Sequence, residues 1–128
     1  MIVYNTTLDN VQAADLQGFL VGWGKPLTPE QHYRILQNSE YLVIASDPEK
    51  KRVVGFINAL SDRVHFDFIP MLEVLPEYQG KGIGTELMKR LLEQVTHLGC
   101  IDLSCDENLQ RFYEKFGMVR HHAMLIRR

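Results

Sequence analysis

The sequence has few of the features that mark secreted, membrane or nucleic-acid-binding proteins. It contains two cysteines and one tryptophan in 128 residues, and its formal net charge of −2 gives no general attraction to nucleic acid. No apolar run approaches the roughly 18 residues that a membrane-spanning helix needs. The first residues have neither the basic start nor the apolar core of a signal peptide. We therefore expect no nucleic-acid or membrane partner and a cytoplasmic location.

Cysteine and histidine are also too sparse to indicate a disulfide framework or a metal centre. Cys100 and Cys105 are five positions apart on one predicted strand, so their side chains point to opposite faces and do not easily bridge. The five histidines show no metal-ligand spacing. We expect reduced thiols, which fit the cytoplasm, and no metal.

What the chain does have is apolar material for one core. Its 128 residues are 45% hydrophobic, and no linker, repeat or low-complexity segment divides them. This length and composition predict a single domain spanning residues 1–128.

The most informative segment is glycine-rich and runs from Gln79 to Gly84. It follows the apolar stretch 69–75 and opens a helix whose apolar residues share one face, namely Ile83, Leu87, Leu91, Val95 and Leu98. Glycines at 80, 82 and 84 lack β-carbons, so a diphosphate can approach the unpaired amides of the first helical turn. The pattern indicates a ligand with a phosphate chain. The alternative is a glycine-rich turn that binds nothing.

Two other phosphate-binding signatures do not fit this segment. The dinucleotide fingerprint needs glycine or alanine where Thr85 or Leu87 stands, depending on the register. Asp102 has the spacing of a ribose-binding acid, but only one strand–helix–strand unit is readable. A Walker loop needs serine or threonine after its Gly-Lys pair, and Pro26 and Gly82 occupy those positions.

The remaining pattern resembles the acetyl-CoA-binding signature of the GNAT superfamily of N-acetyltransferases. The residues that carry this resemblance are Leu72, Val74, Pro76, Gln79, Gly82 and Gly84. The segment 112–118 resembles the second conserved block of the superfamily, in which a tyrosine, here Tyr113, comes shortly before a glycine. Together the two motifs extend the resemblance over about positions 52–118.

The resemblance implies a mixed α/β fold. We expect a mostly antiparallel central sheet flanked by about four helices, with one right-handed crossover and a parallel strand pair that splays apart. From the sequence we predict strands near 2–4, 41–45, 52–60, 64–75 and 100–105, and helices over 9–21, 29–38, 82–98 and 106–116. Gly99 and Asp106 are predicted helix caps. Met118 to Ile126 is predicted to add a bent strand or hairpin, and Pro70 to disturb the sheet.

The resemblance also implies where acetyl-CoA would bind. Its pantetheine arm is expected between the splayed strands, with its phosphates on the glycine-rich loop. Where many members of the superfamily have an asparagine, this chain has Asp106, and Asn108 could make the contact instead. The expected coenzyme-binding residues are Leu72, Glu73, Val74, Gln79, Gly80, Lys81, Gly82, Ile83, Gly84, Thr85, Asn108 and Tyr113.

Two side chains are candidates for proton transfer. Glu73 lies on the strand expected to border the thioester, and strand alternation groups it with Asp67 and Met71, so we predict Glu73 as the general base and Asp67 as second choice. The alternatives are a water chain or a carboxylate that only faces solvent. Tyr113 is the predicted general acid because a phenol with a pKa of about 10 stays protonated at neutral pH. The alternative is a tyrosine that only packs in the core.

The sequence therefore predicts an N-acetyltransferase that moves an acetyl group from acetyl-CoA to a primary amine, a small molecule more than a protein. Trp23 and Phe66, or Phe68, are expected to line the acceptor pocket under the segment 22–38. A monomer or a homodimer fits. The alternatives are a protein N-acetyltransferase and a non-catalytic acyl-CoA sensor.

Overall fold

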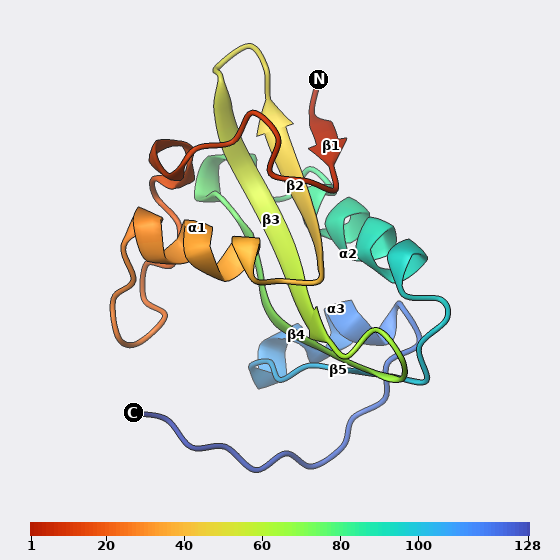
Figure 1. Cartoon of the computed structure of the whole chain (residues 1–128). Helices are drawn as coiled ribbons and strands as arrows, with labels where there is room; N and C mark the ends of the chain where they lie inside the picture. The colour runs from red at the N-terminus through yellow and green to blue at the C-terminus, as the bar shows by residue number, and fades with distance from the viewer.

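The computed structural model describes all 128 residues and contains one five-stranded sheet (Figure 1). The strand order is β1-β2-β3-β4-β5, with antiparallel neighbours except for the parallel pair β4 and β5. This arrangement confirms the predicted fold class. The strands are β1 Val3–Asn5, β2 Tyr41–Asp47, β3 Arg52–Ser61, β4 Phe66–Val74 and β5 Cys100–Asp102.

Helices cover both faces of this sheet. Gly55 of β3 faces α2, because a β-carbon there would lie 3.1 Å from Leu87, whereas the neighbouring Phe56 packs on His32 of α1. Figure 1 shows α1 and α2 on opposite sides of β3, with α3 near β5. The α-helices are α1 Pro29–Gln37, α2 Ile83–Gln94 and α3 Gln110–Glu114, and the 3-10 helices are η1 Ala13–Leu16, η2 Pro76–Tyr78 and η3 Glu107–Leu109. No helix combines the length and the apolar character that a membrane crossing requires.

The start of α1 follows from local chemistry and was predicted correctly. The Thr28 hydroxyl accepts a hydrogen bond from the Gln31 backbone N–H, and the Gln31 side chain accepts one from the Thr28 N–H. Pro29 occupies the first helical turn, where its missing N–H costs nothing.

The predicted helix over 9–21 is wrong, since only the short η1 forms there. Asn10, Gly18 and Leu20 have positive φ angles of 63°, 87° and 65°, which interrupt a right-handed helix at three points. The Gln12–Asp15 capping box therefore supports a single turn.

Of the two predicted caps near β5, Gly99 is wrong, whereas Asp106 occupies the N-cap position of η3 but without a capping side chain. Helix α2 ends at Gln94, although Val95 and Leu98 remain buried, and Gly99 does not cap it. Instead Gly99 lies under the His65 ring, where a β-carbon would clash. The Asp106 side chain makes no capping hydrogen bond, and the helix expected after it is divided into η3 and α3.

At the β5 edge of the sheet, one predicted strand is shorter than expected and another is absent. Strand β5 stops at Asp102, and residues 118–128 contain no strand or hairpin. Figure 1 shows this C-terminal segment running as an extended chain past β5. Both cysteines are free thiols.

Strand β4 contains a bulge. Asn58 pairs with Met71, and Leu60 pairs with Phe68, so two residues of β4 face a single residue of β3. The two residues that form the bulge are Ile69 and Pro70, and both lie opposite Ala59.

The bulge confirms the predicted disturbance at Pro70, which has no N–H for the ladder. It also corrects the predicted alternation. One additional residue reverses the side-chain phase, so Glu73 shares a face with Met71 while Asp67 points to the opposite face.

Candidate active site

A cleft opens where β4 and β5 separate. The two strands pair only from Phe66 with Cys100 to Phe68 with Asp102. Beyond that point, residues 69–72 of β4 and residues 103–106 after β5 line the two walls of a cavity of about 380 Å³. The edge of β4 that faces this cavity has no strand beside it, so its backbone groups are available to a ligand. The predicted opening between these strands is therefore present.

The mouth of α2 forms a second hollow, of about 270 Å³, next to the far end of β4. Its lining includes Val74 and the glycine-rich loop. Gly80 and Gly82 adopt positive φ angles of 77° and 84°, which only glycine takes without strain. The first backbone hydrogen bond of the helix runs from Glu86 to the Gly82 carbonyl, so the preceding amides have no partner in the protein. These amides belong to Gly82, Ile83, Gly84 and Thr85.

The two polar loop side chains behave differently from each other. The Gln79 side chain donates a hydrogen bond of 2.9 Å to the Val74 carbonyl, so it ties the loop to the end of β4. Lys81 is exposed, and its Nζ atom lies 5.3 Å from the centroid of the Tyr78 ring. Gln79 therefore shapes the loop, while Lys81 supplies a cation at its rim.

Tyr113 lies at the wall of the cleft that was predicted for it. It comes from α3 and lines the cavity together with Leu72 and Cys105. Burial, and then the neighbouring Cys105, raise the pKa of the Tyr113 phenol to about 12. The phenol is therefore fully protonated at neutral pH and can donate a proton.

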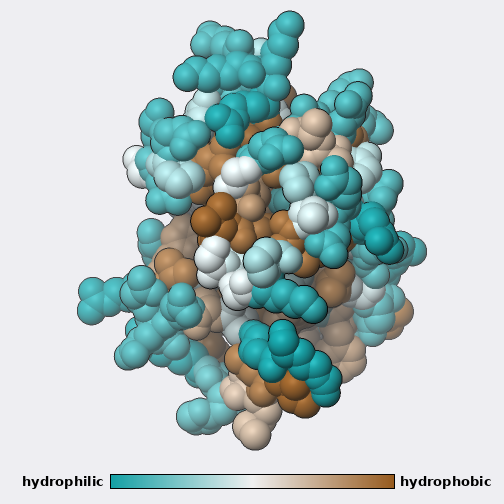
Figure 2. Space-filling view, turned by 90° about the vertical axis from the view of Figure 1, so that its left-hand side faces the viewer, coloured by the Kyte–Doolittle hydropathy of each residue, from teal (hydrophilic) through white to brown (hydrophobic).

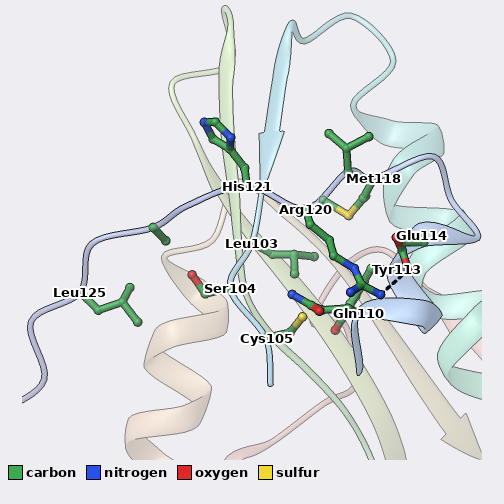
Figure 3. A pocket seen from close by; sticks show the side chains of 12 residues that line it. Leu103, Ser104, Cys105, Gln110, Tyr113, Glu114, Met118, Arg120, His121 and Leu125 are labelled. Carbon is green, nitrogen blue, oxygen red and sulfur yellow. Dashed lines mark hydrogen bonds and ion pairs between the residues drawn. The ribbon is translucent and has the colours of Figure 1, made fainter. Parts of the chain in front are cut away.

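Behind Tyr113 lies another hollow, of about 220 Å³, bounded by the C-terminal segment (Figure 3). Figure 3 shows Cys105, Gln110 and Tyr113 projecting toward the same space. Arg120 closes one side of it through a 3.0 Å ion pair with Glu114. Cys105 thus lines both this hollow and the cleft between β4 and β5.

Glu73 directly follows Leu72, the last residue of β4 that lines the cleft, and does not line the cleft itself. Its side chain points toward the face that carries α1, and Oε1 accepts a 2.9 Å hydrogen bond from the Leu20 N–H. Burial raises the pKa of the Glu73 carboxyl, and the Leu20 hydrogen bond opposes part of that increase. A carboxyl with a raised pKa is suited to accept a proton near neutral pH.

Asp67, the second-choice base, is separated from Glu73 by the bulge. Its side chain is 4% exposed, and neither carboxylate oxygen has a hydrogen-bond partner. Burial and the neighbouring Glu40 carboxylate raise its pKa to about 6. Asp67 does not line the cleft, and the bulge turns its side chain away from the face of the sheet that carries Glu73 and Leu20.

The remaining predicted residues divide into two groups. Trp23 lines the cleft beside Gly22 and is 45% exposed, as an acceptor-contacting residue would be. Phe66 is exposed at the other end of β4, against His65, and does not line the cleft, and neither does Asn108. Asp106 does line it, through the segment that follows β5.

Sequence reasoning missed Ser104 and Cys105. Both line the cleft, and both follow the carboxyl end of a strand in a parallel pair, which is where ligands bind in parallel sheets. That position was the available signal. No group of three or more His, Cys, Asp or Glu side chains is placed to hold a metal ion.

Residues 8–118 match the model of the acetyltransferase (GNAT) family. The chain belongs to this family. The crystal structure of a candidate acetyltransferase from Deinococcus radiodurans R1 is 44% identical, covers 99% of this chain and 88% of that one, and superposes with a TM-score of 0.94.

The relatives of this chain include other proteins named as acetyltransferases. The uncharacterized N-acetyltransferase ycf52 of Porphyra purpurea is 28% identical across 92% of this chain and 71% of that protein. The histone acetyltransferase TAP1 of Glycine max is 29% identical across 84% of this chain and 52% of that protein. The present chain is thus shorter than both of these relatives.

Proposed function

We propose that this protein transfers an acetyl group from acetyl-CoA to a primary amine of a small molecule, by direct attack within a ternary complex. The observation that carries this proposal is the continuity of two features. Unpaired amides at Gly82–Thr85 meet the end of β4, and the cleft between β4 and β5 begins there. A diphosphate attached to a long arm matches that arrangement.

In this proposal the coenzyme diphosphate binds the amides at the mouth of α2, with the helix dipole favouring its charge. The pantetheine arm lies along β4 past Val74 and Leu72, where its amides pair with the free strand edge. The thioester then comes to the part of the cleft that Tyr113 and Cys105 line.

The reaction needs a neutral amine and a proton for the departing thiolate. An amine of the lysine type has a pKa of about 10.4 and is almost wholly protonated at neutral pH, so a base is required. Glu73, with its raised pKa, takes that proton directly or through water. The amine attacks the thioester carbonyl, the carbon–sulfur bond breaks, and Tyr113 donates its phenolic proton to the thiolate. The proton that the nitrogen loses as the amide forms restores the Tyr113 phenol through solvent, and Glu73 releases the proton it took to solvent.

A small acceptor is supported by what flanks the cleft. Gly22 and Trp23 lie opposite the segment after β5, beside the part of the cleft where the thioester is proposed to lie, and they leave the acceptor a place next to it. We further propose a cytoplasmic enzyme, with which two free cysteines are consistent, and that it works as a monomer or a homodimer.

A protein acceptor is the second candidate. The similarity to the soybean histone acetyltransferase favours it, because that relative aligns with 84% of this chain. A lysine side chain and a small primary amine present the same nucleophile, so the chemistry above applies to both.

The test is thiol release from acetyl-CoA, measured with a panel of small amines and with histone and other lysine-rich peptides. We expect saturable release that depends on a small amine, with kcat/KM at least about tenfold higher than for any peptide, and an acetylated product confirmed by mass spectrometry. Preference for a peptide would favour the second candidate. Binding of acetyl-CoA without release with any amine would contradict the enzyme proposal and indicate an acyl-CoA sensor.

A further inference from the structure

The C-terminal segment, residues 118–128, exposes large apolar side chains that nothing in this copy of the chain covers. Met124 is 97% exposed and Ile126 is 77% exposed, and Val119 is exposed as well. Figure 1 shows the end of the segment lying apart from the sheet and the helices, and Figure 2 views the molecule from that side, with hydrophobic and hydrophilic residues next to each other at its lower edge. Several large apolar side chains so close together on a surface indicate a contact with another surface.

Beside this segment lies an apolar groove of about 720 Å³. Its inner wall is formed by Phe68, Leu92, Ile101 and Leu103, and residues 121–125 of the C-terminal segment line the opposite side. The inner wall includes the outer edge of β5, which is the last strand of the sheet and has no strand beside it. An unpaired edge next to an apolar groove is the kind of surface to which an extended segment adds as a further strand.

The C-terminal segment has the form that such an edge accepts. It contains no helix or strand, and none of its backbone groups takes part in a backbone–backbone hydrogen bond. Its N–H and C=O groups are therefore free to pair with an edge strand. Alternate side chains of an extended chain point to the same side, so Met124 and Ile126 can enter an apolar groove together.

Charge complementarity indicates that the partner is a second copy of this chain. The segment has three arginines and no carboxylate side chain, so all sixteen Asp and Glu residues lie in residues 1–117. Asp102 lines the groove, and no Lys or Arg does. Arg127 and Arg128 form no ion pair within their own copy. The same chain thus offers a basic, apolar, extended segment and an acidic surface with an open strand edge, which is the self-complementarity of a two-fold interface.

We propose that two copies of this chain exchange their C-terminal segments. Residues 123–127 of one copy pair with the outer edge of β5 in the other copy, and Met124 and Ile126 occupy the apolar groove of that copy. Because the exchange is reciprocal, both edges are covered and the assembly closes as a dimer. The proposal assigns a surface to the homodimer named above and does not depend on acetyl transfer.

The first measurement is the mass of the full chain by light scattering and sedimentation. We expect a dimer of twice 14.8 kDa, with a dissociation constant of about 1 μM or lower. The double variant Met124→Glu with Ile126→Glu should raise that constant at least about a hundredfold, because two carboxylates would have to enter an apolar groove next to Asp102. Both side chains are exposed in the single copy, so the variant should keep its fold, and circular dichroism checks this.

Val21→Glu is the matched control. Val21 is 80% exposed, precedes α1 and does not line the groove, so this variant should remain a dimer. A dimer that persists in the Met124→Glu, Ile126→Glu variant would overturn the proposal, because another surface would then hold the two copies. A wild-type chain that stays monomeric at about a hundred times the expected dissociation constant would overturn it as well.

The second measurement identifies which copy supplies the segment. Chains with ¹³C-labelled methyl groups are refolded together with unlabelled chains, and isotope-filtered NOE spectra then record only contacts between different copies. We expect contacts from the methyl groups of Met124 and Ile126 to those of Ile101 and Leu103 in these spectra. If these contacts occur only within one copy, the segment folds back on its own sheet and the exchange is wrong.

Discussion

The Glu73 carboxylate accepts a hydrogen bond of 2.9 Å from the backbone N–H of Leu20. This bond joins β4, which borders the coenzyme cleft, to the N-terminal segment. Leu20 has a φ angle of 65°, a conformation that costs a bulky residue about 1–2 kcal/mol, and the hydrogen bond helps to fix it. The same carboxyl has a pKa raised by burial. This side chain therefore positions the segment that leads to Trp23, and in the proposed mechanism it also acts as the base.

Replacing Glu73 by glutamine should lower kcat by about 10²-fold, because the amide cannot accept the amine proton. Glutamine keeps an oxygen for the Leu20 N–H, so the free energy of unfolding should change little. The base works only when ionised, so wild-type activity should fall as pH decreases through the raised pKa of Glu73. That decrease should be absent from the pH profile of the variant.

The matched control is Glu77→Gln. Glu77 is exposed and forms a 3.3 Å ion pair with Arg52, away from the cleft. Its loss should leave the rate and the pH profile unchanged. Identical pH profiles for wild type and Glu73→Gln would remove Glu73 from the mechanism.

Replacing Tyr113 by phenylalanine should lower the rate of the chemical step by about 10²-fold, since the thiolate then leaves without a proton donor. Because burial raises the pKa of the phenol to about 12, the wild type should show no loss of this function up to pH 10. Single-turnover kinetics measures the step directly. Tyr33→Phe is the control, and equal rates for Tyr113→Phe and wild type would assign the tyrosine to packing alone.

Replacing Gly82 by alanine should weaken coenzyme binding about tenfold, because a β-carbon would stand among the amides at the mouth of α2. No protein atom lies within 4 Å of that β-carbon, so only the positive φ of 84° is strained, at about 1–2 kcal/mol of stability. Calorimetry with CoA and thermal unfolding measure the two effects.

Gly24→Ala provides the comparison for that strain. Gly24 has a φ of 80°, also with no atom within 4 Å, and it does not line either hollow of the coenzyme site. It should lose the same stability and keep wild-type affinity for CoA. Equal loss of affinity in both variants would show that the effect at Gly82 is not local.

Replacing Asp67 by asparagine should stabilise the protein at pH 8 by about 1–2 kcal/mol. The folded protein holds the Asp67 proton with a pKa of about 6, whereas the unfolded chain has the ordinary value. Stability is therefore greatest at acidic pH and is lost as pH rises from about 4 to about 6, when the buried carboxyl ionises without a partner. Urea unfolding at pH 4 and pH 8 measures this.

The gain should be much smaller at pH 4, where Asp67 is protonated in the folded state. Asp102→Asn, at an exposed position in β5, is the control and should change stability little at either pH. If Asp67→Asn gained the same stability at both pH values, the ionised Asp67 carboxylate would not be the cause of the destabilisation.

The parts of this structure that sequence predicted are those with a local cause. Thr28 and Gln31 specify the start of α1 by themselves, and the glycines from 80 to 84 mark the loop that opens α2, where the structure adds positive φ angles at Gly80 and Gly82. The cleft between β4 and β5 was expected from the family resemblance, and Tyr113 lines it.

What sequence could not predict depends on contacts far apart in the chain. The phase of β4 changes because of two residues at the bulge, so the alternation that grouped Asp67 with Glu73 was wrong. The orphaned nitrogens of His32 result from packing between α1, Phe19 and Phe56, which no spacing reveals. Residues 118–126 were predicted to add a bent strand or hairpin, but they form no ladder with β5, whose outer edge has no strand beside it.

A crystal structure of the protein bound to CoA tests the central claim most directly. We expect the diphosphate oxygens within hydrogen-bonding distance of the N–H groups of Gly82–Thr85, and the arm between β4 and residues 103–105 with its sulfur near Tyr113. CoA bound elsewhere on the molecule, or β4 and β5 paired along the whole cleft, would contradict the account.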